Sequence, residues 1–477
     1  MMTLPKALNY IDQQWQTPAD TGRDTLHDAN TGELLGYQAM SSSEQVNAAI
    51  ACAKSAFNAG YWSELSYHHR AGYLLKIADA LSLKAESIAE LDAVQTGVVI
   101  SFTRQFAQVC SLAFIAAANL LKELPEQQHL KGEHDNDIIL ERLPLGVAAI
   151  IAPWNAPSGI ACHKIASALA AGCPVIFKPS EWAAGSAQLI AEAISEAELP
   201  EGVFQLVHGG AEVGAMLSNH PAVSAVSFTG GAQGGKAVGQ SCGAQIKPAQ
   251  LELGGNNALL VMADADLDKA AQGVVNGLVT MNAQWCRALG RLICDASIEQ
   301  ALLSKVADLL ANIQLGNSCG TESHMGPLVH NGHLNYIKNR VAHYQNLGGQ
   351  LLQVTPMPNL NGWFYPPTLI TGLDSTQTLE ETFGPVATVH TFDQESQAIA
   401  MANETDYGLA AYVFAEPSTA WRMAKKIRAG VVKINDVSLF ALRPDLPRAA
   451  WGKSGLGDEG VKETFEFFRG TRVVGIA

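Results

Sequence analysis

Between residues 146 and 230, short apolar runs alternate with stretches long enough to form a helix. The runs are rich in β-branched residues and cover residues 147–151, 175–177, 204–207 and 225–228. Strands that are apolar along their whole length and alternate with helices are typical of a parallel sheet covered by helices on both faces. The pattern therefore predicts a doubly wound α/β fold, in which ligands bind at the carboxyl ends of the strands.

A second region, from Asn256 to about Val432, also alternates helical stretches with strand-like ones. The chain has 477 residues, which is more than one hydrophobic core usually serves. We therefore expect a second α/β lobe after the first.

Helix signals also precede the first strand. Ser41 and Glu44 form a capping-box pattern, and apolar residues then recur at helical spacing as far as Phe57. A second helix is expected over about residues 69–91.

Two patterns resemble metal sites, but neither predicts one. His68 and His69 are adjacent, so on a helix they would point in different directions. Three alternating acids occupy residues 263–268, but Lys269 and Val275 stand where a calcium loop would need Gly and Glu. These acids fit the first turn of a helix, where they complement its dipole, and no metal is expected.

Composition excludes several classes of partner. The net charge of −14, without long runs of Lys or Arg, argues against nucleic-acid and anionic-membrane surfaces. The most apolar region, residues 145–177, is interrupted by Pro153, Lys164 and Pro174, so it predicts no membrane span. The N-terminus lacks the pattern of a signal peptide, and the eight cysteines are scattered. Reduced thiols in a cytoplasmic protein are the expectation.

The stretches 251–256 and 283–286 supply one carboxylate, Glu252, and one thiol, Cys286. This pair is the minimum for covalent catalysis through sulfur followed by attack of water. Their separation of 34 positions leaves room for a strand, a helix and a turn that return both side chains to one pocket.

These stretches resemble the general-base and nucleophile motifs of the aldehyde dehydrogenase superfamily. Six further stretches match that family in the same order: 153–155, 178–181, 228–230, 381–385, 407–409 and 452–455. The resemblance covers almost the whole chain. It implies NAD(P)-dependent oxidation of an aldehyde to its acid.

The resemblance implies a catalytic role for three residues. Cys286 is the expected nucleophile, with a depressed pKa to which Arg287 and a helix N-terminus could contribute. Asn155 and the backbone N–H of Cys286 are expected to bind the oxyanion. Glu252 is the expected general base on water. Relatives that pass the acyl group to coenzyme A typically lack this glutamate, so its presence favours hydrolysis.

The cofactor positions follow from the same resemblance. Lys178 and Glu181 match the residues that hold the adenosine ribose. The carboxylate of Glu181 would repel a 2′-phosphate, so NAD is expected in preference to NADP. Glu381 and Phe383 match the residues beside the nicotinamide. The remaining expected cofactor residues are Trp154, Gly210, Gly230, Gly231 and Leu253. Of these, Gly230 begins a GxxxxG stretch, in which glycine allows close approach to a pyrophosphate.

The substrate pocket departs from the family pattern. An aromatic residue often follows the oxyanion asparagine, but here Ala156 does, while Trp285 and Phe440 offer aromatic walls. These residues favour a bulky or aromatic aldehyde. Alternatively, Arg287, Arg443 and Arg448 could pair with the carboxylate of an acid semialdehyde.

The resemblance also predicts domains and assembly. A discontinuous Rossmann-like NAD-binding domain is expected over 1–122 and 145–253, and a catalytic domain over 254–450. A small β arm over 123–144 and 461–477 would join subunits into a homodimer or homotetramer, although a plain linker would also explain the polar stretch from Lys122 to Asp137.

Three alternative functions remain open. They are a CoA-acylating relative, a thiol hydrolase without a cofactor, and a catalytically silent protein with the same fold. The GxGxxG at 455–460 does not follow an apolar strand, so a glycine-shaped loop beside the active site is preferred to a nucleotide site.

Overall fold

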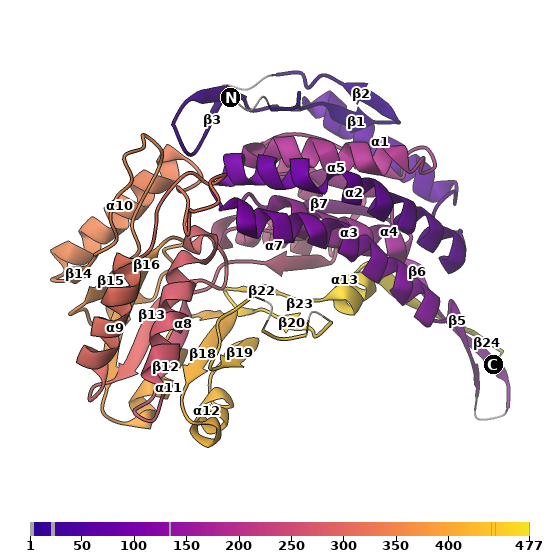
Figure 1. Ribbon diagram of the computed structural model, residues 1–477. Helices are drawn as coiled ribbons and strands as arrows, with labels where there is room; N and C mark the ends of the chain where they lie inside the picture. The colour runs from indigo at the N-terminus through magenta and orange to yellow at the C-terminus, as the bar shows by residue number, and fades with distance from the viewer. Residues whose placement is uncertain (1–3, 21–23, 133–134, 440, 444, 477) are drawn as a thin grey trace.

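The computed structural model comprises two sheets with helices around them and a projecting three-stranded arm (Figure 1). The structure describes residues 4–20, 24–132, 135–439, 441–443 and 445–476. The α/β class expected from the sequence is confirmed.

The first sheet has eight strands, and its centre is parallel. In spatial order the strands are β2 (Gln14–Gln16), β1 (Asn9–Ile11), β9 (Phe204–Leu206), β8 (Val175–Lys178), β7 (Val147–Ile151), β10 (Val223–Thr229), β11 (Ala249–Glu252) and β22 (Gly455–Leu456). The five strands from β9 to β11 run parallel, and β1, β2 and β22 close the edges antiparallel. The four predicted strands are therefore all present.

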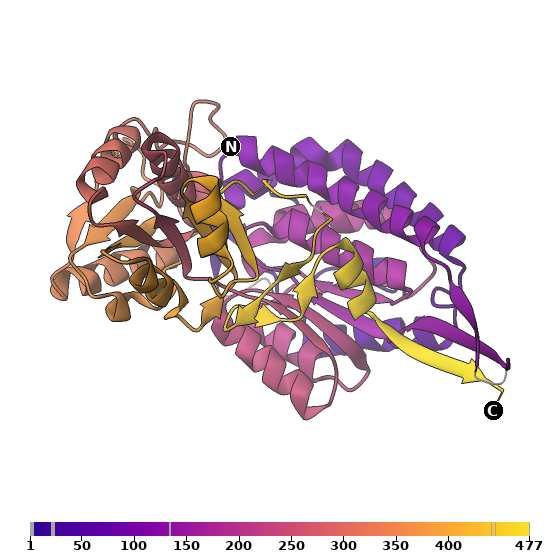
Figure 2. The same cartoon turned by 90° about the horizontal axis from the view of Figure 1, so that it is seen from below.

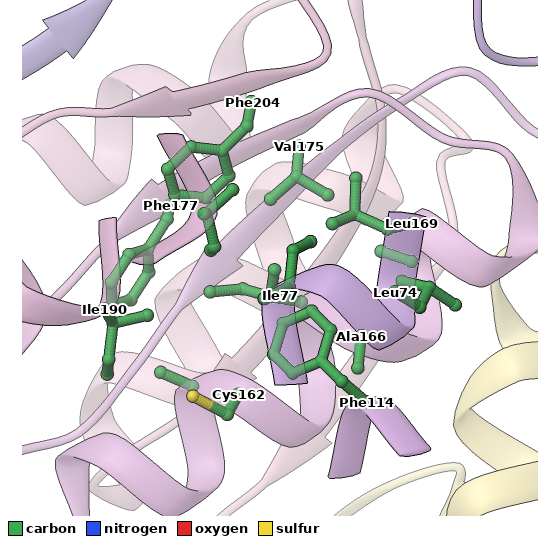
Figure 3. Packing of buried hydrophobic residues seen from close by; sticks show 14 of the residues in the cluster. Leu74, Ile77, Phe114, Cys162, Ala166, Leu169, Val175, Phe177, Ile190 and Phe204 are labelled. Carbon is green, nitrogen blue, oxygen red and sulfur yellow. The ribbon is translucent and has the colours of Figure 1, made fainter. Parts of the chain in front are cut away.

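Each central strand is buried on both faces. In β7, Ala148 and Ile150 join the core on one face, whereas Val147, Ala149 and Ile151 join the core on the other. Alternate residues of a strand point to opposite faces, which explains why the run is continuously apolar. Figure 3 shows the larger core, where Phe177 and Val175 lie close to side chains of the covering helices.

Helices cover both faces of this sheet. One face carries α2 (Tyr67–Thr96), α3 (Ile100–Glu123), α4 (Pro157–Ala171), η1 (Glu181–Ala183) and α5 (Ala184–Glu196), and the other carries α1 (Ser43–Asn58), α6 (Ala211–Asn219) and α7 (Ala232–Ala244). By length and apolar composition α3 could cross a membrane, but here its buried side, including Phe114, packs against α2 and α4.

Two helix predictions need correction at their ends. The capping box of α1 is formed by Ser42 and Gln45, not by Ser41 and Glu44, because the Ser42 side chain accepts from the Gln45 N–H. The second helix runs further than residues 69–91, from a Ser66 cap to Gly97. The acids near residue 266 do begin a helix, since Asp266 caps α8 (Leu267–Val279).

The second sheet has seven strands, all parallel except one at the edge. Its order is β14 (Gln350–Leu352), β15 (Thr368–Thr371), β16 (Val386–Phe392), β13 (Leu289–Asp295), β12 (Asn257–Val261), β18 (Ala410–Phe414) and β19 (Val431–Ile434), with β14 antiparallel. The surrounding helices are α8, η2 (Thr280–Ala283), α9 (Glu299–Ala311), α10 (Asn331–Asn346), η3 (Ser375–Thr378), α11 (Glu395–Asn403) and α12 (Pro417–Ala424). This is the expected second α/β lobe.

The arm brings together two distant parts of the chain. Strand β6 (Asp137–Pro144) pairs on one side with β5 (Gln127–Lys131) and on the other with β24 (Arg469–Gly475). Figure 2 shows these strands extending away from the body, with the C-terminus near the arm's tip. Helix α13 (Val461–Phe467) precedes β24, and the short strands β3 (Thr25–His27), β4 (Leu34–Tyr37), β17 (Tyr407–Gly408), β20 (Arg448–Ala449), β21 (Trp451–Gly452) and β23 (Asp458–Glu459) form three small ladders.

Candidate active site

Glu252 and Cys286 meet where the two sheets face each other. Glu252 is the last residue of β11 in the first sheet, and Cys286 lies in the turn between η2 and β13 of the second lobe. The Cys286 Sγ lies 3.5 Å from Glu252 Oε1. The predicted pairing of thiol and carboxylate is therefore present in the fold.

The turn before Cys286 has an uncommon backbone. Met281, Asn282 and Ala283 have φ angles of 51°, 58° and 51°, in the left-handed region that side chains other than glycine disfavour. The Asn282 amide compensates by donating to the carbonyls of Gly97 and Pro327, each at 2.8 Å, and its Oδ1 accepts from the Gly326 N–H. A buried amide side chain thus holds the strained turn in place.

Further amides fix the residues on both sides of the thiol. Gln284 donates to the Thr96 carbonyl and accepts from the Val329 N–H. Asn257 donates to the carbonyls of Cys286 and Ala288, at 2.9 and 2.8 Å. Sequence reasoning missed all three amides, Asn257, Asn282 and Gln284, because their partners are remote in the chain.

Two hydrogen-bond donors lie near the thiol. Asn155 follows β7 and donates one amide hydrogen to the Gln284 carbonyl at 2.8 Å, which leaves its second amide hydrogen available. Among the described residues, the backbone N–H of Cys286 has no hydrogen-bond partner. Asn155 is thus attached by a hydrogen bond to the turn that carries Cys286, and both groups retain an N–H without a partner among the described residues.

The electrostatics of the pair differ from the expectation for Cys286. Burial raises the pKa of the Cys286 thiol well above its usual value, and Glu252 raises it further, while the Arg287 guanidinium lowers it. No helix begins at this turn among the described elements. The expected depressed pKa is therefore wrong for this arrangement, and Cys286 needs a base to become a thiolate.

Glu252 has the acid–base properties that such a base requires. Burial, and then the charge of Glu459, raises the pKa of Glu252 to about 7. A carboxylate with this pKa is basic enough to accept a proton from a thiol or a water near neutral pH.

A buried ion network lies behind Glu252. Lys164 of α4 is fully buried and pairs with Glu459 at 2.5 Å, and its ammonium also donates to Ser227 Oγ at 2.9 Å. Burial would raise the pKa of Glu459, but Lys164, Arg448 and His163 together lower it to about 2. Glu459 lies in the loop that the GxGxxG pattern marked, so the interpretation of that loop as a border of the active site fits the structure.

Two glycines allow this close assembly. Gly455 pairs with Glu252 across β22 and β11, and a Cβ at Gly455 would lie 2.2 Å from the Leu251 carbonyl oxygen. A Cβ at Gly254 would lie 1.9 Å from the Glu381 carboxylate. Both positions therefore require a residue without a side chain.

Three of the expected cofactor residues lie together beyond the ends of β8 and β9. The Lys178 ammonium is buried and donates to the carbonyls of Pro179 and Gly209, at 2.8 and 2.6 Å. Gly210 caps α6, and a Cβ there would meet Glu181 Oε1 at 4.0 Å. An ammonium, a carboxylate and a helix N-terminus thus share one edge of the first sheet.

The glycine loop after β10 leads into α7. Gly231 is the N-cap of that helix, and no atom lies within 4 Å of the place where its Cβ would be. Gly230 donates its N–H to the Glu252 carbonyl, and Leu253 packs against Gly235 of α7. The loop therefore connects the general base to an open helix N-terminus.

Trp154, Phe383 and His333 form an aromatic cluster. Phe383, with φ of 53°, and Trp154 pack edge to face with ring centroids 5.5 Å apart. His333 of α10 contacts both rings, and its Nε2–H donates to the Phe383 carbonyl at 2.8 Å. Glu381 accepts from the Gly255 N–H at 2.7 Å, and burial raises its pKa to about 7. His333 was not predicted, since nothing in its sequence neighbourhood marks it.

The expected pocket residues fall into an apolar wall. Ala156 and Trp285 are buried in one cluster, and four partly buried side chains that the sequence did not mark pack against it: Phe102, Phe106, Ile160 and Leu439. Phe440 lies outside the described residues, so its predicted place in the wall is not described.

The three arginines have different surroundings. Arg443 is exposed and pairs with Asp445, and Arg448 lies 3.8 Å from Glu459. Arg287 is buried beside Cys286 and has no ion-pair partner among the described residues.

Comparison with known proteins gives consistent matches along the chain. A sequence model of the aldehyde dehydrogenase family matches residues 15–474. Geranial dehydrogenase of Castellaniella defragrans is 30% identical, with 96% of each chain covered. Peroxisomal aminoaldehyde dehydrogenase 1 of Pisum sativum is 34% identical, with 94% of this chain and 92% of the relative covered.

Solved structures match equally closely. The crystal structure of betaine aldehyde dehydrogenase from Staphylococcus aureus in complex with NAD+ superposes with a TM-score of 0.94 at 30% identity. The superposition covers 99% of this chain and 95% of that one.

Proposed function

This chain belongs to the aldehyde dehydrogenase family, and from that premise we propose that it uses NAD to oxidise a bulky, largely apolar aldehyde to its acid by way of a thioester that water hydrolyses. The observation that carries the proposal is the 3.5 Å approach of the Cys286 thiol to the Glu252 carboxylate at the meeting edge of the two sheets. Covalent catalysis by sulfur needs a nucleophile within reach of a base.

The first step is attack of Cys286 on the aldehyde carbon. The Cys286 thiol is protonated at neutral pH because burial raises its pKa, and Glu252 is the base in position to remove that proton. The thiolate then adds to the carbonyl, and the oxygen becomes an alkoxide. The free amide hydrogen of Asn155 and the Cys286 N–H stabilise that alkoxide.

When bound, NAD accepts the hydride that leaves the substrate carbon. The residues present fit a dinucleotide. Lys178, with two of its three donors on carbonyls, and Glu181 offer groups for ribose hydroxyls. The α6 and α7 N-termini, at Gly210 and Gly231, offer N–H groups to a pyrophosphate.

The last step is release of the acid. Glu252 first releases to solvent the proton that it took from the Cys286 thiol, and it then accepts a proton from a water. That water attacks the thioester carbon, the acid forms, and Cys286 leaves as a thiolate that is protonated again. The charges of the buried pair Lys164 and Glu459 act on Glu252 in opposite directions, since Glu459 raises its pKa and Lys164 lowers it. Because Glu252 is present and close to Cys286, we favour hydrolysis over transfer to coenzyme A.

The proposal also includes a cofactor preference and a substrate class. NAD is proposed over NADP because the Glu181 carboxylate, which is expected to bind the adenosine ribose, would repel a 2′-phosphate. The apolar wall around Trp285 supports a bulky or aromatic substrate. The named relatives act on geranial, aminoaldehydes and betaine aldehyde, so similarity does not select a substrate.

Assembly and location are also proposals. The arm presents exposed apolar side chains, among them Val473, Val474 and Leu130, which supports a homodimer or homotetramer in which the arm contacts a neighbouring subunit. All eight cysteines are free, which supports a cytoplasmic location.

The proposal is tested by following NADH formation at 340 nm with benzaldehydes, long aliphatic aldehydes, aminoaldehydes and acid semialdehydes. We expect turnover with NAD, weaker turnover with NADP, and a loss of at least about a thousandfold in Cys286→Ala. Exposed Cys319→Ala is the matched control and should retain activity. Absence of NADH with every aldehyde, despite NAD binding, would refute general aldehyde oxidation.

A further inference from the structure

Arg287 is a buried cation without a partner. Its side chain is 9% exposed, and its Nε is fully buried without a hydrogen bond. In the described part of the chain, the Arg287 guanidinium forms neither an ion pair nor a hydrogen bond, and the one bond at this residue is from the Tyr412 hydroxyl to its backbone carbonyl at 2.6 Å. Burying a guanidinium in this way is costly unless an anion joins it.

The groups that face Arg287 do not neutralise it. They are Cys286, Glu252, Tyr412 and Glu459, together with Lys433 on the other side. Glu459 is already paired with Lys164 at 2.5 Å, and the pKa of Glu252 is raised to about 7, so its charge is only partial at neutral pH. Burial lowers the pKa of Arg287 and the first four of these groups raise it through their charge, but in the described part of the chain none of them forms a hydrogen bond or an ion pair with its guanidinium.

Lys433 is a second buried cation in the same place. It lies on β19 directly opposite Tyr412 of β18, the residue whose hydroxyl holds Arg287. Its side chain is buried, and its ammonium donates to the Ser438 carbonyl. Burial, and then the charge of Arg287, lowers the pKa of Lys433 to about 8. No ion pair among the described residues includes Lys433, and the carboxylate that influences it, Asp436, is exposed.

The two cations adjoin the apolar wall. Arg287 stands between Trp285 and Ala288, both of which belong to that wall. Leu439, which packs against the wall, follows Ser438, whose carbonyl holds Lys433. Two buried cations therefore lie next to residues of the apolar cluster, and one of them adjoins Cys286 in the chain.

From this juxtaposition we propose that Arg287 and Lys433 form a subsite for a carboxylate, so that the substrate is an aldehyde with an apolar or aromatic body that carries a carboxylate near the carbonyl. The inference rests on the proposed function and deepens it by naming the substrate class. A carboxylate accepts two parallel hydrogen bonds from a guanidinium, and the ammonium of Lys433 adds charge. The other two arginines of the original alternative do not contribute, since Arg443 pairs with Asp445 and Arg448 with Glu459.

The first test compares 3-carboxybenzaldehyde with its methyl ester as substrates of the full-length enzyme. We expect kcat/KM to favour the carboxylate. In Arg287→Met the ratio of the two values should fall by about 10- to 100-fold, the range for loss of one charge-assisted hydrogen bond. Most of the fall should lie in KM, and Arg287→Lys should restore part of it. Arg443→Met, which removes an exposed arginine that pairs with Asp445, is the control and should not change the ratio.

The second test needs no turnover. Iodoacetate is anionic and iodoacetamide is neutral, and both alkylate thiols. We expect the ratio of their rates at Cys286, measured by mass spectrometry of its peptide, to exceed the ratio at exposed Cys319, and to fall in Arg287→Met and in Lys433→Met. If Arg287→Met does not fold, Lys433→Met gives the same comparison.

The outcomes separate the two proposals. No preference for either anion in the unaltered enzyme, or an equal loss with carboxylate and ester in Arg287→Met, would overturn the carboxylate subsite. In the second case Arg287 would serve the nucleophile alone. No NADH from any aldehyde, while Cys286 still prefers iodoacetate, would instead contradict the proposed oxidation and leave the anion site standing.

Discussion

The turn that carries Cys286 and the turn that begins helix α7 are built in opposite ways. The first is held by amide side chains on both sides, with three successive residues in the left-handed region. The second consists of small residues, and open space surrounds the Cβ position of Gly231. The contrast shows that the position of Cys286 is fixed by contacts within the protein, whereas the turn at Gly231 leaves space beside its backbone.

The largest expected effect concerns the base beside the nucleophile turn. Glu252→Gln keeps the shape but cannot accept a proton, so we expect kcat to fall by roughly 10²- to 10⁴-fold. In the unaltered enzyme kcat should rise with pH through about 7, because Glu252 is active only after it loses its proton. The variant should lose this acid limb. Retention of the limb in Glu252→Gln would assign it to another group, such as Glu381.

The next effect concerns Asn155, the proposed oxyanion donor, which donates a hydrogen bond to Gln284 in the turn that carries Cys286. Asn155→Ala removes the amide and should cost ~2.7–4 kcal/mol of transition-state stabilisation, or roughly 100- to 1000-fold in kcat. Asn155→Asp tests whether shape alone is enough, since a carboxylate would repel the alkoxide. NAD binding, measured by protein fluorescence, should be unchanged. An equal weakening of NAD binding would show that Asn155 acts through the cofactor side.

Substitutions in the two turns should differ most clearly in their effect on the free energy of unfolding. Asn282→Ala removes three buried hydrogen bonds and places alanine at a φ of 58°, so the free energy of unfolding should fall by about 3 kcal/mol. Gly231→Ala, with a φ of −71°, should instead change that free energy by less than about 1 kcal/mol, because the smaller entropy of the unfolded chain stabilises the variant whereas alanine is a poorer N-cap than glycine. Denaturant unfolding of both variants measures this. Similar losses in the two variants would erase the contrast.

The smallest effect concerns cofactor choice on the open side. Glu181→Ser removes the carboxylate that faces Gly210, so the ratio of kcat/KM for NADP over NAD should rise about tenfold, equivalent to ~1.4 kcal/mol. Steady-state kinetics with both cofactors and one aldehyde measures it. Glu212→Ser, at the first turn of the neighbouring α6, is the control. An unchanged ratio would place the discrimination elsewhere.

Much of this architecture could be predicted from the sequence because it depends on local patterns. The apolar runs predicted the central strands of the first sheet, since a strand buried on both faces must be apolar at every position. Cys286 and Glu252 could be proposed as nucleophile and base from the residues adjacent to them in the chain, and the structure places the two side chains 3.5 Å apart. The error at the start of α1 was a shift of one residue, because Ser41, Ser42 and Ser43 can all cap a helix and only packing selects among them.

The properties that depend on distance through space could not be predicted in this way. The pKa of Glu252 is set by burial and by Glu459, which is more than two hundred residues away in the chain. The arrangement of Arg287, Tyr412 and Lys433 likewise joins three separate segments. The sequence by itself determined the fold class and the chemical groups of the site. Only the tertiary structure decided the charge that surrounds each group and which amides hold it, because both depend on contacts between remote segments.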